Sequence, residues 1–140
     1  MKALDTNVLA RFFVDDDDDP QAARQRPAAI EALSRRSVVT VTVLLEFEWV
    51  LRGFYDAPRR EIAGVLRALA SIPHVAIEDR PAVMTAIEGY EHGLDFADAL
   101  HVARSTRAAG FATFDARLAR RARRLGARWP VELLDSARPS

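Results

Sequence analysis

Short apolar runs and longer stretches with helical spacing alternate along the whole chain. Five runs rich in apolar residues predict strands, at 1–4, 37–41, 74–77, 111–114 and 129–134. Between them, apolar residues recur at i, i+3 and i+4, which predicts helices from about residue 7, over 21–36, 43–55, 58–71, 80–92 and 96–109, and after residue 115. This alternation favours an α/β fold with three layers, α/β/α, around a mostly parallel central sheet. A chain of 140 residues suits a single domain, here residues 1–140.

Three local features qualify these elements. Residues 15–19 are five consecutive aspartates, and because like charges repel and aspartate is a poor helix former, we expect a solvated loop there. A cation site and a docking surface for a basic partner are the alternatives for this run. Pro27 lies inside the helix predicted over 21–36 and is expected to bend or break it. Thr42 is suited to cap the helix predicted over 43–55.

Composition narrows the classes of function. The apolar share is 49%, which favours a folded core over disorder. No apolar run approaches the roughly 20 residues that span a bilayer, and the start of the chain lacks the pattern of a secretory signal, so we expect a soluble cytoplasmic protein. The absence of cysteine excludes a disulfide framework, a thiolate nucleophile and a cysteine-based zinc site. Glycine-rich phosphate loops and the G-x-S-x-G motif are absent as well.

Charge is distributed unevenly although the net charge is zero. Residues 1–99 contain 17 acids and 11 bases, whereas residues 100–140 contain 3 acids and 9 bases. Nineteen of the 20 bases are arginine, so a high arginine share is a property of the whole chain and is not by itself a signal for nucleic-acid binding. Five arginines follow Asp115 on one predicted helix, and the alternatives for them are a solvated flank and contacts with RNA phosphates. They are Arg117, Arg120, Arg121, Arg123 and Arg124.

Acidic residues recur where predicted strands end or where the next helices begin. Asp5 follows the first strand, Asp115 follows the strand at 111–114, and Asp98 lies in the first turn of a helix that Asp95 is placed to cap. Capping of the next helix by Asp5 or Asn7 is the alternative for the first acid, and a capping box with aspartate in place of glutamate is the alternative for Asp95 and Asp98. Because the carboxyl ends of parallel strands converge on one edge of a sheet, we expect the acids to meet there. The set also includes Glu46, in the first part of the helix predicted over 43–55.

Two glutamates of that helix are distinguished by their neighbours. Glu48 has Arg52 four residues later, the favourable order for an ion pair on a helix surface. Glu46 has only apolar residues at i−3, i+3 and i+4, including Trp49, and no basic residue at those positions. We therefore expect Glu48 on the surface and Glu46 on an apolar face, where a carboxylate requires a partner, a metal ion or a proton.

The chemistry expected of such an acidic site is metal-dependent. Carboxylates that meet within a few ångströms repel one another and take up protons unless a cation neutralises them. Oxygen ligands without histidine or cysteine favour Mg²⁺ or Mn²⁺. These ions activate water and hold phosphate oxygens, so hydrolysis of a phosphodiester is the expected reaction.

Four motifs of this sequence resemble those of the PIN-domain family, and especially its VapC-type toxins from bacterial and archaeal toxin–antitoxin pairs. The motifs are Leu4-Asp5-Thr6-Asn7-Val8-Leu9, Glu46-Phe47-Glu48-Trp49-Val50-Leu51, Asp95-Phe96-Ala97-Asp98-Ala99-Leu100 and Thr113-Phe114-Asp115. They occur in the family's order and the resemblance extends from residue 1 to about residue 134. The run of five aspartates is longer than the family pattern at this loop.

The resemblance implies a set of roles. It makes Asp5, Glu46, Asp98 and Asp115 the catalytic, metal-binding acids and Asp95 an accessory metal ligand. Hydrogen-bonding support for the carboxylates is assigned to Thr6, Asn7 and Thr113. It also implies an endoribonuclease dependent on Mg²⁺ or Mn²⁺, a homodimer, and an antitoxin protein that blocks the site. The alternative is a catalytically silent PIN-like module that binds RNA or protein.

Overall fold

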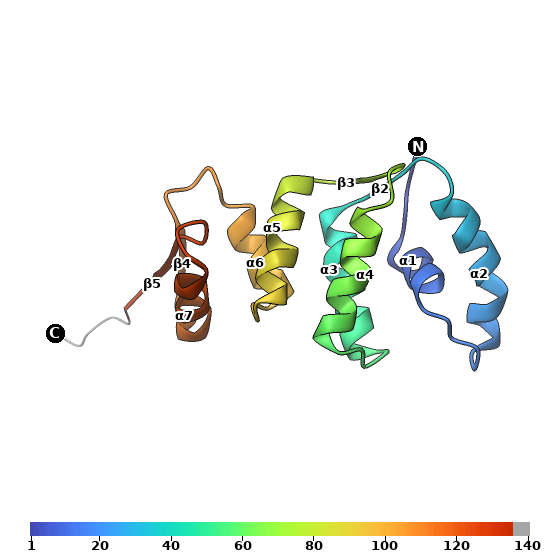
Figure 1. Cartoon of the computed structure of the whole chain (residues 1–140), viewed down its shortest axis with the longest axis horizontal. Helices are drawn as coiled ribbons and strands as arrows, with labels where there is room; N and C mark the ends of the chain where they lie inside the picture. The colour runs from blue at the N-terminus through green and yellow to red at the C-terminus, as the bar shows by residue number, and fades with distance from the viewer. Residues whose placement is uncertain (136–140) are drawn as a thin grey trace. The chain divides into compact units, whose positions relative to one another are not determined.

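The strands of the computed structural model lie where the apolar runs predict them, and every pairing within the described residues, 1–135, is parallel (Figure 1). One sheet has the order β1-β2-β3, formed by Lys2–Ala3, Ser37–Val39 and Val75–Ile77. The other sheet pairs β4 with β5, formed by Phe111–Thr113 and Val131–Leu133. The contacts divide the chain into a first unit, Met1–Val83, and a second unit, Met84–Ser140, and each is described by itself.

Seven helices alternate with these strands in residues 1–135. They are α1 (Thr6–Phe13), α2 (Pro20–Leu33), α3 (Val41–Gly53), α4 (Arg59–Ala70), α5 (Arg80–Glu91), α6 (Phe96–Ala103) and α7 (Ala116–Leu125). The predicted α/β class with parallel strands is therefore confirmed, and the element order agrees with a three-layer α/β/α fold. No helix in the described part of the chain is long and apolar enough to cross a membrane.

In the first unit, strand pairing and helix packing fix the end of β1 relative to α3. The amide of Leu4 donates to the carbonyl of Val38 at 3.0 Å, which carries the pairing of β1 with β2 one residue further. Helix α1 packs against both α2 and α3, while α4 packs against α3 and β3. The side chains of Leu9 and Phe47 are fully buried in this packing. Buried apolar contact thus fixes the start of α1 relative to α3.

Two expectations about helix boundaries in the first unit are wrong. Helix α2 runs from Pro20 through the exposed Pro27 to Leu33, so the proline does not break it. Helix α3 begins at Val41 with Thr40 as its N-cap, so Thr42 does not cap it. The amide of Val41 instead donates to the carboxylate of Glu78 at 2.9 Å, which supplies the acceptor that a capping side chain would have supplied.

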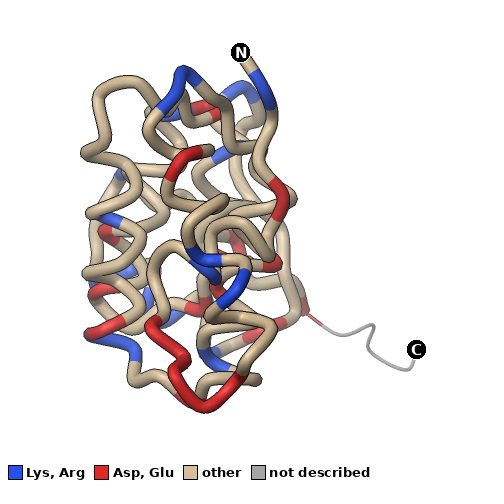
Figure 2. Tube along the Cα trace, turned by 90° about the vertical axis from the view of Figure 1, so that its right-hand side faces the viewer, with Lys and Arg blue, Asp and Glu red and all other residues tan. Residues whose placement is uncertain are grey.

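The run of five aspartates forms the loop between α1 and α2, as expected, and appears as a continuous acidic turn in Figure 2. Asp19 caps α2 by accepting the amide of Gln21 at 2.9 Å, and Asp15 pairs with Arg26 at 3.0 Å. A side-chain hydrogen bond with Asp15, together with its charge, raises the pKa of Asp17. The loop is therefore held at both ends by polar contacts.

In the second unit, the aromatic side chain of Trp129 packs against helix α5. Helix α7 packs on β4 and β5, and the rings of Tyr90 and Phe96 meet edge to face with centroids 5.6 Å apart. The indole of Trp129 lies so close to Gly89 of α5 that a Cβ there would come within 2.5 Å of it. Gly89 is thus required by the packing of Trp129, which is itself buried.

Helix α6 ends at Ala103, whereas the sequence pattern predicted a helix to residue 109. The residues from 104 to 109 contribute no buried side chain, so packing does not favour further turns. The hydroxyl of Ser105 also donates to the carbonyl of His101 at 2.6 Å, and the chain continues in turns.

Candidate active site

Asp5 lies at the carboxyl end of β1 and caps α1. Its Oδ1 accepts the amide of Thr6 at 2.8 Å, and its side chain is exposed. The pairing of β1 with β2 and the buried Leu4 bring the chain to this edge, and capping explains why an acid is tolerated there. The carboxylate keeps further oxygen lone pairs for another ligand.

Glu46 of α3 is joined to the start of α1 by one buried hydroxyl. Thr6, which is only 3% exposed, donates its hydroxyl hydrogen to Oε1 of Glu46. This bond brings Glu46 beside the residue that follows Asp5, so two of the predicted acids belong to one edge of the first unit. The side chain of Asn7 is exposed and makes no hydrogen bond within residues 1–135.

The expected burial of the two α3 glutamates is reversed. Glu48 is only 4% exposed, whereas Glu46 is exposed. The ion pair of Glu48 with Arg52 is present as predicted, at 2.9 Å, but its carboxylate is buried. Because α3 is apolar around most of its circumference, sequence spacing alone selected the wrong face. The core face consists of Val41, Leu44, Phe47, Glu48 and Leu51, while Trp49 is 61% exposed.

Three acids of the second unit mark the starts of α6 and α7. Asp95 caps α6 by accepting the amide of Asp98 at 3.1 Å, and Asp115 caps α7 by accepting the amide of Arg117 at 2.9 Å. The hydroxyl of Thr113 accepts the amide of Asp115 at 3.0 Å, so Thr113 fixes the backbone of that acid rather than its carboxylate.

Asp98 is partly buried, and its surroundings favour the protonated form. Burial raises the pKa of Asp98, and the charges of Asp95 and Asp115 raise it further, while His101 lowers it. His101 is exposed and its ring stacks parallel to that of Phe111, with centroids 6.3 Å apart. The charges of Asp95 and Asp115, at the starts of α6 and α7, therefore act on Asp98.

A family model for the PIN domain matches residues 2–124. The chain belongs to the PIN domain family. No curated protein and no solved structure matches it significantly. The PIN domain is a nuclease-type fold whose nucleases generally use divalent metals, and the matched segment contains all five predicted acids.

The acids of this PIN domain suit a hard divalent cation by their chemistry. All five offer only oxygen, and the burial and neighbouring charges that raise the pKa of Asp98 disfavour its charged form, which a bound cation would stabilise. Within residues 1–135, however, no three histidine, cysteine, aspartate or glutamate side chains are arranged to hold a metal ion. Asp5 and Glu46 belong to the first unit and the other three acids to the second, so neither unit carries the complete predicted set.

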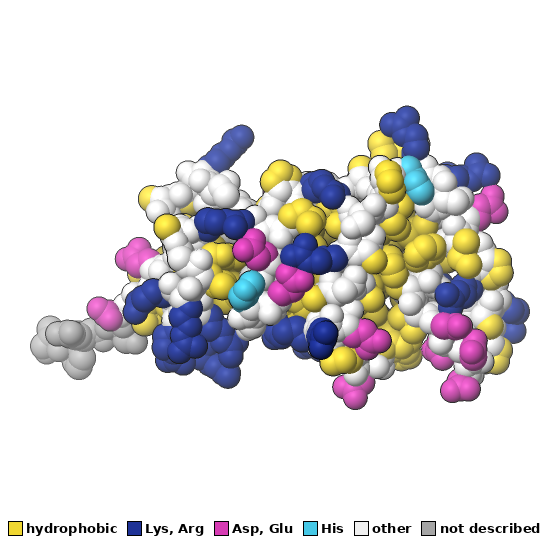
Figure 3. Space-filling model, viewed as in Figure 1, with side chains coloured by type: hydrophobic (Ala, Val, Ile, Leu, Met, Phe, Trp, Pro, Cys, Tyr) yellow, Lys and Arg dark blue, Asp and Glu magenta, His cyan; other side chains and the backbone are white. Residues whose placement is uncertain are grey.

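The arginines predicted on the helix after Asp115 form an exposed basic surface on α7 of the PIN domain (Figure 3). Arg121 donates to the carbonyl of Gly93 at 2.8 Å. The others make no ion pair or side-chain hydrogen bond in the described part of the chain. They are Arg117, Arg120, Arg123 and Arg124.

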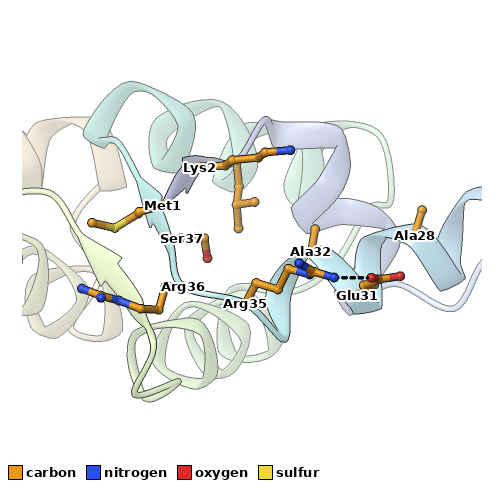
Figure 4. A pocket seen from close by; sticks show the side chains of 9 residues that line it. Met1, Lys2, Ala28, Glu31, Ala32, Arg35, Arg36 and Ser37 are labelled. Carbon is orange, nitrogen blue, oxygen red and sulfur yellow. Dashed lines mark hydrogen bonds and ion pairs between the residues drawn. The ribbon is translucent and has the colours of Figure 1, made fainter.

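A cavity of about 820 Å³ lies at the other ends of the strands in the first unit (Figure 4). Lys2 and Ser37, at the starts of β1 and β2, line it together with Arg35, which pairs with Glu31 at 2.9 Å. The hydroxyl of Ser37 is buried and finds no hydrogen-bond partner among residues 1–135. None of the predicted acids lines this cavity, so it is separate from the candidate site.

Phe114 directly precedes Asp115, and the sequence pattern assigns no function to Phe114. It completes the apolar run at 111–114, which predicts a strand residue, yet its side chain is 69% exposed. The strand β4 ends one residue earlier, at Thr113, and Phe114 occupies the turn before Asp115. The position of Phe114 next to a predicted catalytic acid was readable in the sequence, but its exposure was not.

Proposed function

We propose that this chain is a metal-dependent endoribonuclease, formed by one nuclease domain over residues 1–140. Asp98 carries the proposal: its pKa is raised by burial and by two neighbouring carboxylates, inside a segment that matches the PIN domain. Burial beside two carboxylates disfavours the charged form of Asp98, and a bound cation would offset that cost.

In this proposal the five predicted acids are the ligands of the metal ion. Asp5, Glu46, Asp98 and Asp115 hold Mg²⁺ or Mn²⁺, with Asp95 as an accessory ligand, and the ion supplies activation of water and neutralisation of phosphate charge. Thr6 orients Glu46 through its hydroxyl, and Thr113 holds the backbone at Asp115. Asn7 keeps its amide group available for a carboxylate or for substrate.

The exposed arginines of α7 are the proposed contacts to the RNA backbone. Arg117, Arg120, Arg121 and Arg124 supply positive charge on the helix that Asp115 caps. Contacts of this kind release counterions, so RNA binding should weaken steeply as salt concentration rises.

The biological setting is proposed from the resemblance of the four motifs to VapC-type toxins. The chain would act in the cytoplasm as the toxin of a type II toxin–antitoxin pair, as a homodimer, and a cognate antitoxin protein would block the acidic site. Copurification of a small antitoxin protein that inhibits cleavage is the result expected for this setting.

The decisive experiment is RNA cleavage with and without metal. The purified protein should cleave RNA in Mg²⁺ or Mn²⁺ and stop in excess chelator, and Asp98→Asn should abolish cleavage while the thermal unfolding transition is retained. Glu132→Gln, on the exposed face of β5, is the matched control and should cleave normally. Undiminished cleavage by Asp98→Asn, or by the unaltered protein in chelator, contradicts the proposal.

A catalytically silent RNA- or protein-binding module is the second candidate. It is favoured by the absence, among residues 1–135, of three side chains arranged to hold a metal ion. This module would bind RNA or a protein partner in chelator with full affinity and would cleave no RNA in any divalent metal.

A further inference from the structure

Phe114 has a large apolar side chain that is exposed to solvent. It is 69% exposed, and its ring contacts no other aromatic ring within residues 1–135. Single exposed apolar residues are common on protein surfaces, so exposure alone carries no function. Phe54 is similarly exposed, at 73%, but its ring meets that of Tyr55 edge to face at a centroid distance of 4.9 Å.

The backbone on both sides of Phe114 is held by hydrogen bonds. The carbonyl of Thr113 accepts the amide of Leu134 at 2.8 Å, and the hydroxyl of Thr113 accepts the amide of Asp115 at 3.0 Å. Oδ1 of Asp115 then accepts the amide of Leu118 at 3.1 Å. The exposed ring is therefore presented from a fixed turn, which lowers the entropic cost of binding a ligand against it.

The residues that follow Phe114 in the chain have the chemistry of a single-strand binding surface. Asp115, a predicted metal ligand, follows it directly, and Arg117 and Arg120 of α7 are exposed without an ion-pair partner within residues 1–135. An aromatic ring beside cationic side chains binds single-stranded nucleic acid, because bases stack on the ring while the cations bind phosphates.

We propose that Phe114 is a stacking platform for one base of a single-stranded RNA substrate, held beside the phosphodiester to be cleaved. This inference rests on the proposed function and specifies its substrate class. Bases of a duplex are stacked on one another and are not available to the ring, so a single-stranded segment is the preferred substrate.

The test is the affinity for a labelled single-stranded RNA oligonucleotide of mixed sequence, measured in chelator so that no cleavage occurs. Phe114→Ala and Phe114→Leu should each weaken binding about tenfold, because neither side chain stacks on a base. Phe114→Trp should retain the affinity or raise it. Phe54→Ala is the matched control, since it removes an equally exposed ring from the first unit, and it should bind as the unaltered protein does.

The possible failures are distinguishable. Equal affinity of Phe114→Ala and the unaltered protein, with metal-dependent cleavage intact, overturns the stacking role and leaves the nuclease assignment standing. Full affinity of Phe114→Leu shows that apolar contact without stacking suffices, and an equal loss on a duplex of the same sequence contradicts single-strand preference; either result overturns the inference. If the unaltered protein neither binds nor cleaves RNA, the proposed function fails together with this inference.

Discussion

The two glutamates of α3, in the first unit, and Asp98, in the second unit, differ in how the chain stabilises their charge. In the first unit, Glu46 accepts the hydroxyl of Thr6, and the buried Glu48 pairs with Arg52. In the second unit, Asp98 lies under the influence of two other acids, and none of the arginines of α7 forms an ion pair with them in the described part of the chain. Glu46 and Glu48 are thus stabilised by partners within the chain, whereas the charged form of Asp98 is destabilised by burial and by the charges of Asp95 and Asp115, which an external cation or proton would relieve.

Substitution of the two glutamates of α3 should have the largest effects, on RNA cleavage for Glu46 and on the free energy of unfolding for Glu48. Glu46→Gln should lose most RNA cleavage and bind Mn²⁺ more weakly, with the free energy of unfolding nearly unchanged because the residue is exposed. Glu48→Gln should lower the free energy of unfolding by about 1–3 kcal/mol, because it removes a charge-assisted hydrogen bond from a buried site, and should keep the cleavage rate of folded protein. Urea unfolding and RNA cleavage of both variants measure this. Loss of cleavage by Glu48→Gln, with an active Glu46→Gln, would reverse the assignment.

A pair of helical glycines, one in each unit, should give stability effects of opposite sign. Gly89→Ala of α5 brings a Cβ against the indole of Trp129 and should lower the free energy of unfolding by about 1–3 kcal/mol. Gly64→Ala of α4 meets no atom within 4 Å and should raise it by about 0.5–1 kcal/mol through better helix propensity. Urea unfolding of the two variants provides the comparison. A stable Gly89→Ala would mean that Trp129 moves aside easily.

The smallest expected effect is on the pH dependence of stability in chelator. Folding raises the pKa of Asp98, so its ionised form destabilises the fold at pH values above the folded pKa, and this penalty disappears below the pKa of the unfolded chain. Asp98→Asn should therefore be slightly more stable at pH 7, by less than about 1 kcal/mol because solvent screens the repulsion. The gain should vanish as the pH falls towards about 4, the ordinary aspartate range. Thermal unfolding at several pH values tests this, and Glu132→Gln should show no such gain.

Sequence pattern predicts most of the fold because the elements are short and their apolar stripes are clear. The strand at β2 and the helix at α4 lie within one or two residues of their predicted bounds. Helix α3 shows the limit of the method, because nearly every face is apolar and spacing cannot select the one that packs. The early end of α6 shows a second limit. The residues after Ala103 have no buried side chain to stabilise further helical turns, and spacing in the sequence does not reveal this.

The sequence predicted which residues form the candidate site better than it predicted the contacts between them. Capping was expected of Asp5 or Asn7 and of Asp95, and the structure confirms the caps at Asp5 and Asp95 and shows a third at Asp115. Spacing gave no means of joining Thr6 to Glu46, because a bond between residues 40 apart depends on how α1 packs against α3. Convergence of the acids from both units stays a prediction.

The indole that presses on Gly89 also has an optical consequence. The chain contains two tryptophans, Trp129 buried in the second unit and Trp49 exposed on the first. A buried indole emits at shorter wavelength and resists quenching by dissolved iodide, whereas an exposed one does neither. The emission of Trp129 therefore reports the unfolding of the second unit without any added label, whereas that of Trp49, which is exposed in the folded chain, changes little.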